Sequence, residues 1–173
     1  MLGLAKDYDI GLAFAPVDLA TAGFTGKLIS MYDCSGIDIV LVYGAGTDGD
    51  DPVPSLQQHT AYTGGTASDL AIMDTIYRKA ETLLDNDESW VKTTQTAAAI
   101  MTAVADDAQK QKIYVIHVPA AALADGNTHV SVNQADLSNN AQLAAGLYFK
   151  VGLQSQRTPP NMPNLLRPAA ANA

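Results

Sequence analysis

Residues 37–43 read IDIVLVY, and this stretch decides the fold class. Its odd-numbered residues are all apolar and share one face of an extended strand, whereas Asp38, Val40 and Val42 lie on the other face. A period of two is typical of a β-strand and does not match the 3.6-residue period of an amphipathic helix. The stretch therefore predicts a strand with one face packed against a core.

The flanking residues extend this interpretation in both directions. Residues 26–32, GKLISMY, form a second extended run, and the turn-like DCSG at 33–36 separates the two runs. We therefore predict a β-hairpin over 26–43. After the hairpin, the glycines of GAGTDG end the strand, and residues 47–70 are expected to form a long polar loop that starts in extended geometry.

Further strands are predicted from the same signals. The run IYVIHV at 113–118 is apolar on both faces, which is typical of a central strand in a sandwich, and a strand at the start of the chain should stop at Pro16. The predicted strands besides the hairpin are 9–15, 72–79, 90–94, 113–118, 128–132 and 147–153.

Two segments depart from the strand pattern. The alanine-rich stretch 95–112 favours helix by propensity, and we predict one short helix around 103–111, with the start of the stretch open to a loop interpretation. The last twenty residues, 154–173, contain four prolines and should form an extended arm, either ordered on a partner or frayed. The expected fold is all-β: an antiparallel β-sandwich or jelly roll over 1–153, followed by this arm.

Composition excludes several function classes. The chain of 173 residues has a formal net charge of −8, and nucleic-acid binding needs clustered cations instead. No signal segment or membrane-spanning run is expected, and Cys34 is the single cysteine, so the chain should be made in a reducing compartment and not act at a membrane. The acids concentrate in the first half, and none follows Asp136. An acidic body with a mildly basic tail suggests a protein partner.

The acidic and histidine residues do not form a recognisable catalytic or metal motif. The turn with Asp48, Asp50 and Asp51 lacks the glycine and glutamate spacing of an EF-hand, although another type of Ca²⁺ site remains an alternative there. We expect 85–88 to be a solvated acidic loop and Trp90 to lie in the core. The sequence thus predicts no catalytic residue, no metal site and no cofactor.

The histidines and the cysteine are the remaining possible ligands or nucleophiles, and structural roles account for them better. Among the histidines, His117 is expected to be buried and hydrogen-bonded, whereas His129 is expected to be exposed; His59 lies far from both in the sequence. Cys34 is expected to be a partly buried thiol without a catalytic partner. A hydrolase is therefore the least favoured class.

An ordered set of stretches resembles a known family. AFAPVDLATAGFTGKLISM leads into the segment that ends YGAGTDGDDPVPSLQQ, and WVKTTQ, KIYVIHVPAAAL, HVSVNQAD and NAQLAAGLYF follow. Over about residues 10–153 the chain resembles small virion proteins of tailed bacteriophages, encoded near the major capsid gene. The resemblance implies a capsid decoration, or cement, protein on the outer surface of the head, made in the host cytoplasm. Its implied partners are the major capsid protein and further copies of itself, as a trimer.

The arm and the polar loop at 47–70 are the two expected contacts with the capsid. The candidate anchors in the arm are Arg157, Met162, Leu165, Leu166 and Arg167. A neck or tail component of the same virion is one alternative. The other is a carbohydrate-binding β-sandwich module, in which Tyr43, Tyr62, Tyr114 or Tyr148 would stack on sugars from one sheet face.

Overall fold

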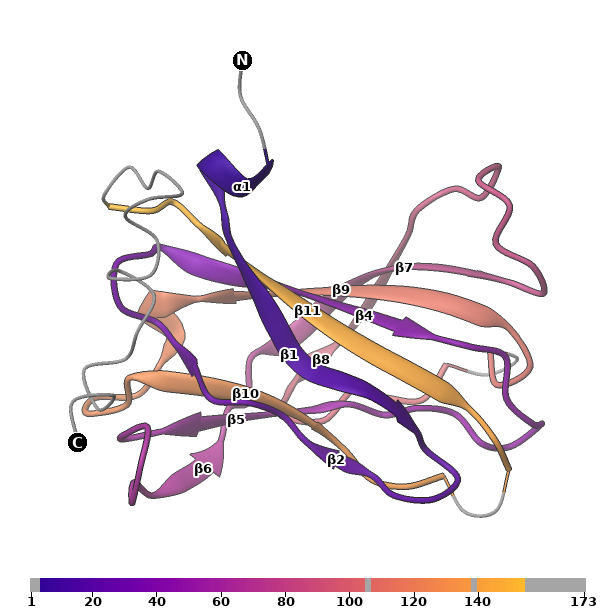
Figure 1. The fold of residues 1–173 in the computed structure, drawn as a ribbon, viewed down its shortest axis with the longest axis horizontal. Helices are drawn as coiled ribbons and strands as arrows, with labels where there is room; N and C mark the ends of the chain where they lie inside the picture. Colours follow the sequence, from indigo (N-terminus) through magenta and orange to yellow (C-terminus); the bar gives the residue numbers. More distant parts are fainter. Residues whose placement is uncertain (1–3, 105–106, 138–139, 155–173) are drawn as a thin grey trace.

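The computed structural model describes residues 4–104, 107–137 and 140–154, which fold into two antiparallel β-sheets (Figure 1). Its strands are β1 (Asp9–Asp18), β2 (Phe24–Thr25), β3 (Ile29–Ser30), β4 (Gly36–Tyr43), β5 (Ser55–His59), β6 (Ala67–Asp69), β7 (Met73–Glu81), β8 (Val91–Ala98), β9 (Gln111–Pro119), β10 (His129–Gln134) and β11 (Leu143–Val151). The helical pieces in the described residues are one turn of α-helix, α1 (Leu4–Asp7), and a 3₁₀ turn, η1 (Ala120–Ala122). The prediction of an all-β sandwich is therefore confirmed.

The larger sheet has six strands in the order β1-β11-β4-β9-β7-β8. Its two central strands, β4 and β9, are the two stretches that the sequence shows as most apolar, and Val40 is the register partner of Val115. Because both strands are apolar on both faces, a central position buries more of their surface than an edge would. The predicted central position of 113–118 is confirmed.

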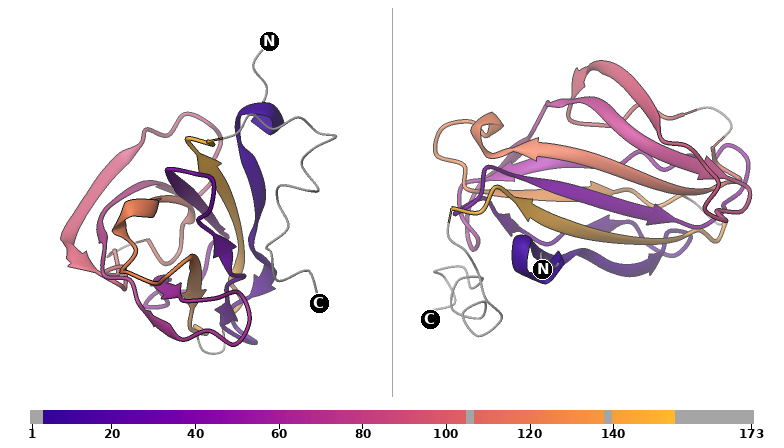
Figure 2. Two further views of the ribbon diagram at one scale, coloured as in Figure 1. Left: turned by 90° about the vertical axis from the view of Figure 1, so that its left-hand side faces the viewer. Right: turned by 90° about the horizontal axis from the view of Figure 1, so that it is seen from above.

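The smaller sheet lies against one face of the larger one. It has the order β2-β10-β5-β6, and β3 also pairs with β10. Figure 2 shows that the strands of the two layers run lengthwise through the molecule. Most connections cross from one layer to the other, as between β1 and β2, β3 and β4, β4 and β5, and β6 and β7.

The hydrophobic core fills the space between the sheets. It includes the inward residues Ile37, Ile39 and Leu41 of β4, all fully buried. Near the sandwich edge, the ring of Phe14 stacks on that of Phe24 with centroids 3.5 Å apart, which joins β1 to β2. The alternation expected in 37–43 is confirmed, since Val40 and Val42 face outward and remain partly exposed.

The predicted hairpin over 26–43 is wrong. The extended residues are present, but β3 pairs with β10 in the smaller sheet while β4 pairs with β9 and β11 in the larger one. The turn between them changes layers, and Asp33, not Gly36, adopts the positive φ, at 60°. Gly36 instead begins β4, where an added Cβ would lie 2.8 Å from the carbonyl oxygen of Val118.

The predicted helix around 103–111 is also wrong within the described residues. The alanine-rich start continues β8 to Ala98, and residues 108–110 form a turn and bend before β9. Gln95 holds the intervening turn, because its side chain donates to the carbonyls of Met73 and Ile100 and accepts from the Thr102 amide at 2.7 Å. Tertiary hydrogen bonds thus override helix propensity here.

Two other boundaries differ from expectation. The segment 47–70 is not one long loop, because it contains β5 and β6. β1 does not stop at Pro16 but continues to Asp18, with register shifts on either side of Phe14. Pro16 is tolerated because β1 is an edge strand, where a missing amide donor leaves no ladder bond unmade. In the described ranges, no helix is long and apolar enough to cross a bilayer.

Candidate functional site

The outward face of the six-stranded sheet is a continuous apolar surface. One row runs across five strands in direct register: Leu12, Leu147, Val40, Val115 and Tyr77. Rows on either side contribute further apolar side chains. We call the complete set the apolar face: Ile10, Leu12, Val40, Val42, Tyr77, Ile113, Val115, Ala145, Leu147 and Phe149.

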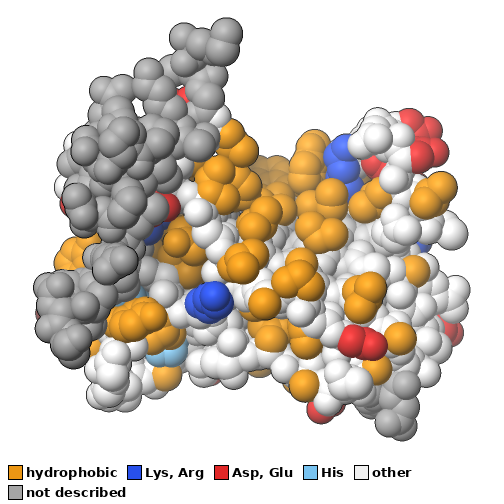
Figure 3. All heavy atoms as spheres, in the orientation of Figure 1, with side chains coloured by type: hydrophobic (Ala, Val, Ile, Leu, Met, Phe, Trp, Pro, Cys, Tyr) orange, Lys and Arg blue, Asp and Glu red, His pale blue; other side chains and the backbone are white. Residues whose placement is uncertain are grey.

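These side chains remain accessible because the smaller sheet covers only the opposite face. Leu12 is 42 % exposed, Val42 44 % and Tyr77 47 %, and the other members are partly exposed. Figure 3 shows hydrophobic side chains spread across the middle and upper part of the face in view, over the region where β1, β11 and β4 lie in Figure 1. An apolar surface of this extent on a folded domain is typical of a protein–protein contact.

Charged groups lie at the ends of the apolar face. Asp38 and His117 are register partners on β4 and β9, and their side chains are hydrogen-bonded, with an Nδ1–Oδ1 distance of 2.7 Å. On the opposite side of the row, Lys79 lies 5.4 Å from the centre of the Trp90 ring and 3.8 Å from a carboxylate oxygen of Glu88. A depression of about 390 Å³, lined in part by Tyr77 and His117, lies at the β7–β9 end.

The structure reverses two predictions about histidines. His117 is exposed on the outer face instead of buried in the core, because it occupies an outward position of β9. His129, predicted to be exposed, is only 5 % exposed on β10. The outward position of His117 could have been predicted from the alternation along the strand, because its neighbours Ile116 and Val118 both face inward.

His59 and His129 come together as register partners on β5 and β10. His59 Nε2 lies 2.9 Å from Ser131 Oγ, and His129 Nδ1 lies 2.8 Å from Thr128 Oγ1. Desolvation lowers the pKa of both rings, and for His129 the neighbouring His59 and Lys150 lower the pKa further. The two imidazoles are therefore neutral, and each lies beside a hydroxyl group. We interpret this cluster as part of a polar face of the smaller sheet. The third histidine, His117, lies on the other sheet and does not join them.

A second polar cluster lies inside the sandwich and was not foreseen. Asp107 is buried and forms ion pairs with Arg78 and, at 3.4 Å, with Lys110. Lys112 on β9 is fully buried, and its ammonium donates to the Ala108 carbonyl at 3.3 Å. Desolvation is the largest influence on this amine and lowers its pKa to about 8, against the opposing effect of Asp107. The burial of Lys112 could have been predicted from the alternation along β9, in which position 112 faces inward.

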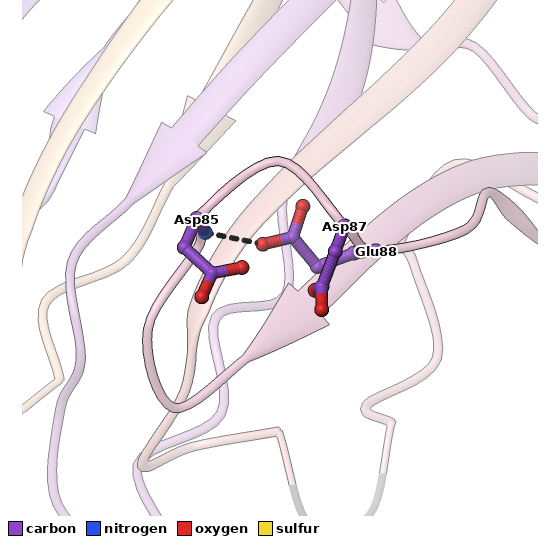
Figure 4. A group of neighbouring side chains, drawn as sticks. All are labelled: Asp85, Asp87 and Glu88. Carbon is purple, nitrogen blue, oxygen red and sulfur yellow. Dashed lines mark hydrogen bonds between the residues drawn. The ribbon is translucent and has the colours of Figure 1, made fainter.

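Among the described residues, three acids come together in the loop between β7 and β8: Asp85, Asp87 and Glu88 (Figure 4). Figure 4 shows the Glu88 carboxylate turned toward Asp85, and this carboxylate accepts hydrogen bonds from the Asp85 amide at 2.6 Å and the Asn86 amide at 3.2 Å. These bonds close a turn in which Asn86 has a φ of 82°. The acidic run therefore has a structural role as a side-chain-closed turn, which agrees with its interpretation as a loop.

The acidic turn at 48–51 does not form a comparable group. Among the described residues, the carboxylates of Asp48, Asp50 and Asp51 are not close enough together to count as a set of metal ligands. Asp50 instead accepts a hydrogen bond from Asn140 at 2.7 Å. The Ca²⁺ alternative for this turn thus has no support in the geometry.

Two further predicted positions can be placed. Cys34 is buried, with its Sγ 3.4 Å from the Met31 carbonyl oxygen, and it belongs to the hydrophobic core. Trp90, predicted to be in the core, is 53 % exposed and lies just before the edge strand β8. The arm anchors Arg157, Met162, Leu165, Leu166 and Arg167 lie outside the described residues.

The four tyrosines named for sugar stacking do not form one exposed aromatic platform. Tyr43 and Tyr114 are buried between the sheets, with ring centroids 5.6 Å apart, and burial raises the pKa of both phenols. Tyr62, exposed in the β5–β6 loop, and Tyr148 of β11 both line a depression of about 310 Å³, but Tyr148 is only partly exposed there and packs against the core. The carbohydrate-binding interpretation therefore lacks the aromatic platform that it predicts.

Comparison with protein-family models, with curated proteins and with solved structures finds no match to this chain.

Proposed function

We propose that this chain is a virion structural protein of a tailed bacteriophage, a decoration protein that binds the outside of the head. In this role it bridges subunits of the major capsid protein and performs no chemistry. The observation that supports the proposal best is the apolar face, which spans five strands of one sheet and is only partly buried. Such a surface suits an architecture of subunits held together by broad contacts.

The physical basis of a cement function is linkage. A protein that binds the assembled shell, but not the free subunits, shifts the assembly equilibrium toward the shell. Stable occupancy needs a contact of about 1,000 Å² or more for each copy. The proposed capsid contact is the arm, residues 154–173, which carries two arginines, no acid and three large apolar side chains. The body is acidic, with a net charge of −8 for the whole chain, and this suits an outer surface better than a compartment filled with DNA.

The test is binding to heads of the encoding phage from which this protein has been removed. The full chain should cosediment with these heads until its sites are saturated. A chain ending at Gln154 should fold equally well, as judged by circular dichroism and melting temperature, and should lose most of its binding because the proposed anchors are gone.

A matched pair of full-length variants separates arm chemistry from arm length. Replacing Met162, Leu165 and Leu166 by serine should weaken binding, whereas replacing Asn161 and Asn164 by serine should leave binding unchanged. Saturation of heads by the truncated chain would show that the arm is not the anchor. Electron microscopy that places the chain in a ring at the neck or tail would contradict the head location itself.

A further inference from the structure

We propose that the apolar face is an isologous contact with a second copy of this chain, arranged around a two-fold axis that runs parallel to the strands between β4 and β9. This inference deepens the proposed function, and rests on it only in taking the face to be a protein contact. It names the partner on that face and replaces the trimer implied by the resemblance with a pair.

The sheet order gives the first argument. Three strands lie on each side of the β4–β9 boundary: β1, β11 and β4 on one side, and β9, β7 and β8 on the other. Rotation about the proposed axis exchanges these halves and preserves position along the strands. Each β4 residue of one copy therefore lies over a β9 residue of the other copy. That β9 residue has the same number as the residue with which the β4 residue pairs within its own sheet.

At the centre of the contact, apolar side chains meet apolar side chains, and toward its edges Lys79 lies over Ala145 and Lys92 over Leu12. Val40 lies over Val115 of the second copy, and Val42 over Ile113, because these are register pairs within the sheet. One strand farther out, Leu147 of β11 lies over the equivalent of Tyr77. Aligned packing of two sheets about 10 Å apart, as inside β-sandwiches, brings such side chains into interdigitating contact.

Charge gives the second argument and selects the axis. Asp38 and His117 are also register partners, so the same rotation places the carboxylate of each copy over the imidazole of the other. Both side chains retain exposure, at 35 % and 52 %, and can form these contacts at the rim. An axis perpendicular to the strands would place Asp38 over the end of the face that contains Val42, which would bury a carboxylate against a valine. The strand-parallel arrangement avoids that cost.

Sedimentation of the full-length chain over a concentration series tests the proposal. The wild type should sediment as a dimer that dissociates on dilution. Val40→Glu and Val115→Lys should each raise the dissociation constant more than about tenfold, because each places an unpaired charge at the centre of the contact. Thr63→Glu, in the exposed β5–β6 loop, is the matched control and should leave the dimer intact.

Mixing variants tests the axis itself. V40E mixed with V115K should restore a heterodimer, because the introduced carboxylate lies over the introduced amine while the other half of the contact remains Val115 over Val40. V40E mixed with V40K should stay monomeric, because on this axis position 40 does not face position 40. Equal restoration in both mixtures would overturn the assigned axis, and a V40E chain that remains dimeric would overturn the assigned face.

The wild type alone also decides the question if a charged variant fails to fold. A monomer at about 100 µM, or a trimer, contradicts the proposal, since a contact of this kind should hold at concentrations in the micromolar range. Head binding is not measured in these experiments. A failure to pair thus leaves the proposed capsid role standing, and a dimer that ignores heads leaves the pairing standing.

Discussion

Lys112 shows how one side chain sets a pH dependence for the whole fold. Its amine is buried on the inward face of β9, and its pKa is lowered from 10.5 to about 8. The unfolded chain therefore binds more protons than the folded chain between these two values. Stability should rise with pH across this window and should be independent of this group below it.

The corresponding prediction concerns Lys112→Met. Compared with this variant, the wild type should gain on the order of 2 kcal/mol of unfolding free energy between pH 7 and pH 10. Urea denaturation at several pH values measures the difference, in which contributions common to both chains, such as Tyr43 and Tyr114, cancel. Lys92→Met, at an exposed position on β8, is the control and should show no such gain. Parallel curves for wild type and K112M would contradict the assignment.

At the scale of elements, the Gln95 side chain stabilises a turn in the alanine-rich segment for which propensity favours a helix. Its three hydrogen bonds connect β8 to the start of β7 and to the residues that follow β8. Gln95→Ala should reduce the unfolding free energy by about 1–3 kcal/mol, because the Thr102 amide and the Met73 carbonyl lose their partner. Chemical denaturation measures this change.

The control for the Gln95 prediction lies next to it on the same strand. Thr96→Ala, at an exposed position, should stay within about 0.5 kcal/mol of the wild type. Hydrogen exchange offers a second readout, since amide protection at Thr102 should fall in Q95A and persist in T96A. Equal stability of the two variants would mean that the turn is held by the remaining backbone contacts.

The same scale shows what could be predicted from the sequence. Strands such as 37–43 and 113–118 are recognisable because their alternation is a local property of the chain. The partners of β3 and β4 could not be predicted from the sequence. A turn that carries the chain from one sheet to the other uses the same residue types as a turn that closes a hairpin. The helix prediction failed for a related reason: propensity is local, whereas the bond from Gln95 to Met73 and the ion pair of Asp107 with Arg78 depend on segments distant in the sequence.

For the molecule as a whole, the candidate site was visible in the sequence only as composition. Apolar residues on both faces of 113–118 were attributed to burial in a sandwich, yet one of these faces lies on the outside of a two-layer fold. Which face of a strand is covered depends on the number of sheets that are stacked in the fold. The sequence of a single strand does not indicate that number. The arm raised the expectation of a partner, but its candidate anchors lie outside the described residues.

The two proposed contacts, pairing and arm, predict cooperation on the head. A dimer carries two arms, so the second arm binds at an effective concentration set by the first, and the pair should bind heads more tightly than a single chain. V40E should therefore bind heads at least about tenfold more weakly than the wild type although its arm is unchanged. Cosedimentation with stripped heads at graded protein concentrations measures this difference.

Mixing again supplies the control for this prediction. V40E together with V115K should recover most of the lost affinity, because the heterodimer restores two arms in one particle. A V40E chain ending at Gln154 should lose what binding remains, since it lacks both pairing and the proposed anchor. If V40E binds heads as tightly as the wild type, each arm acts alone and pairing has no part in attachment. If the wild type binds only as a dimer and the truncated dimer binds equally well, the capsid contact lies on the folded body and not on the arm.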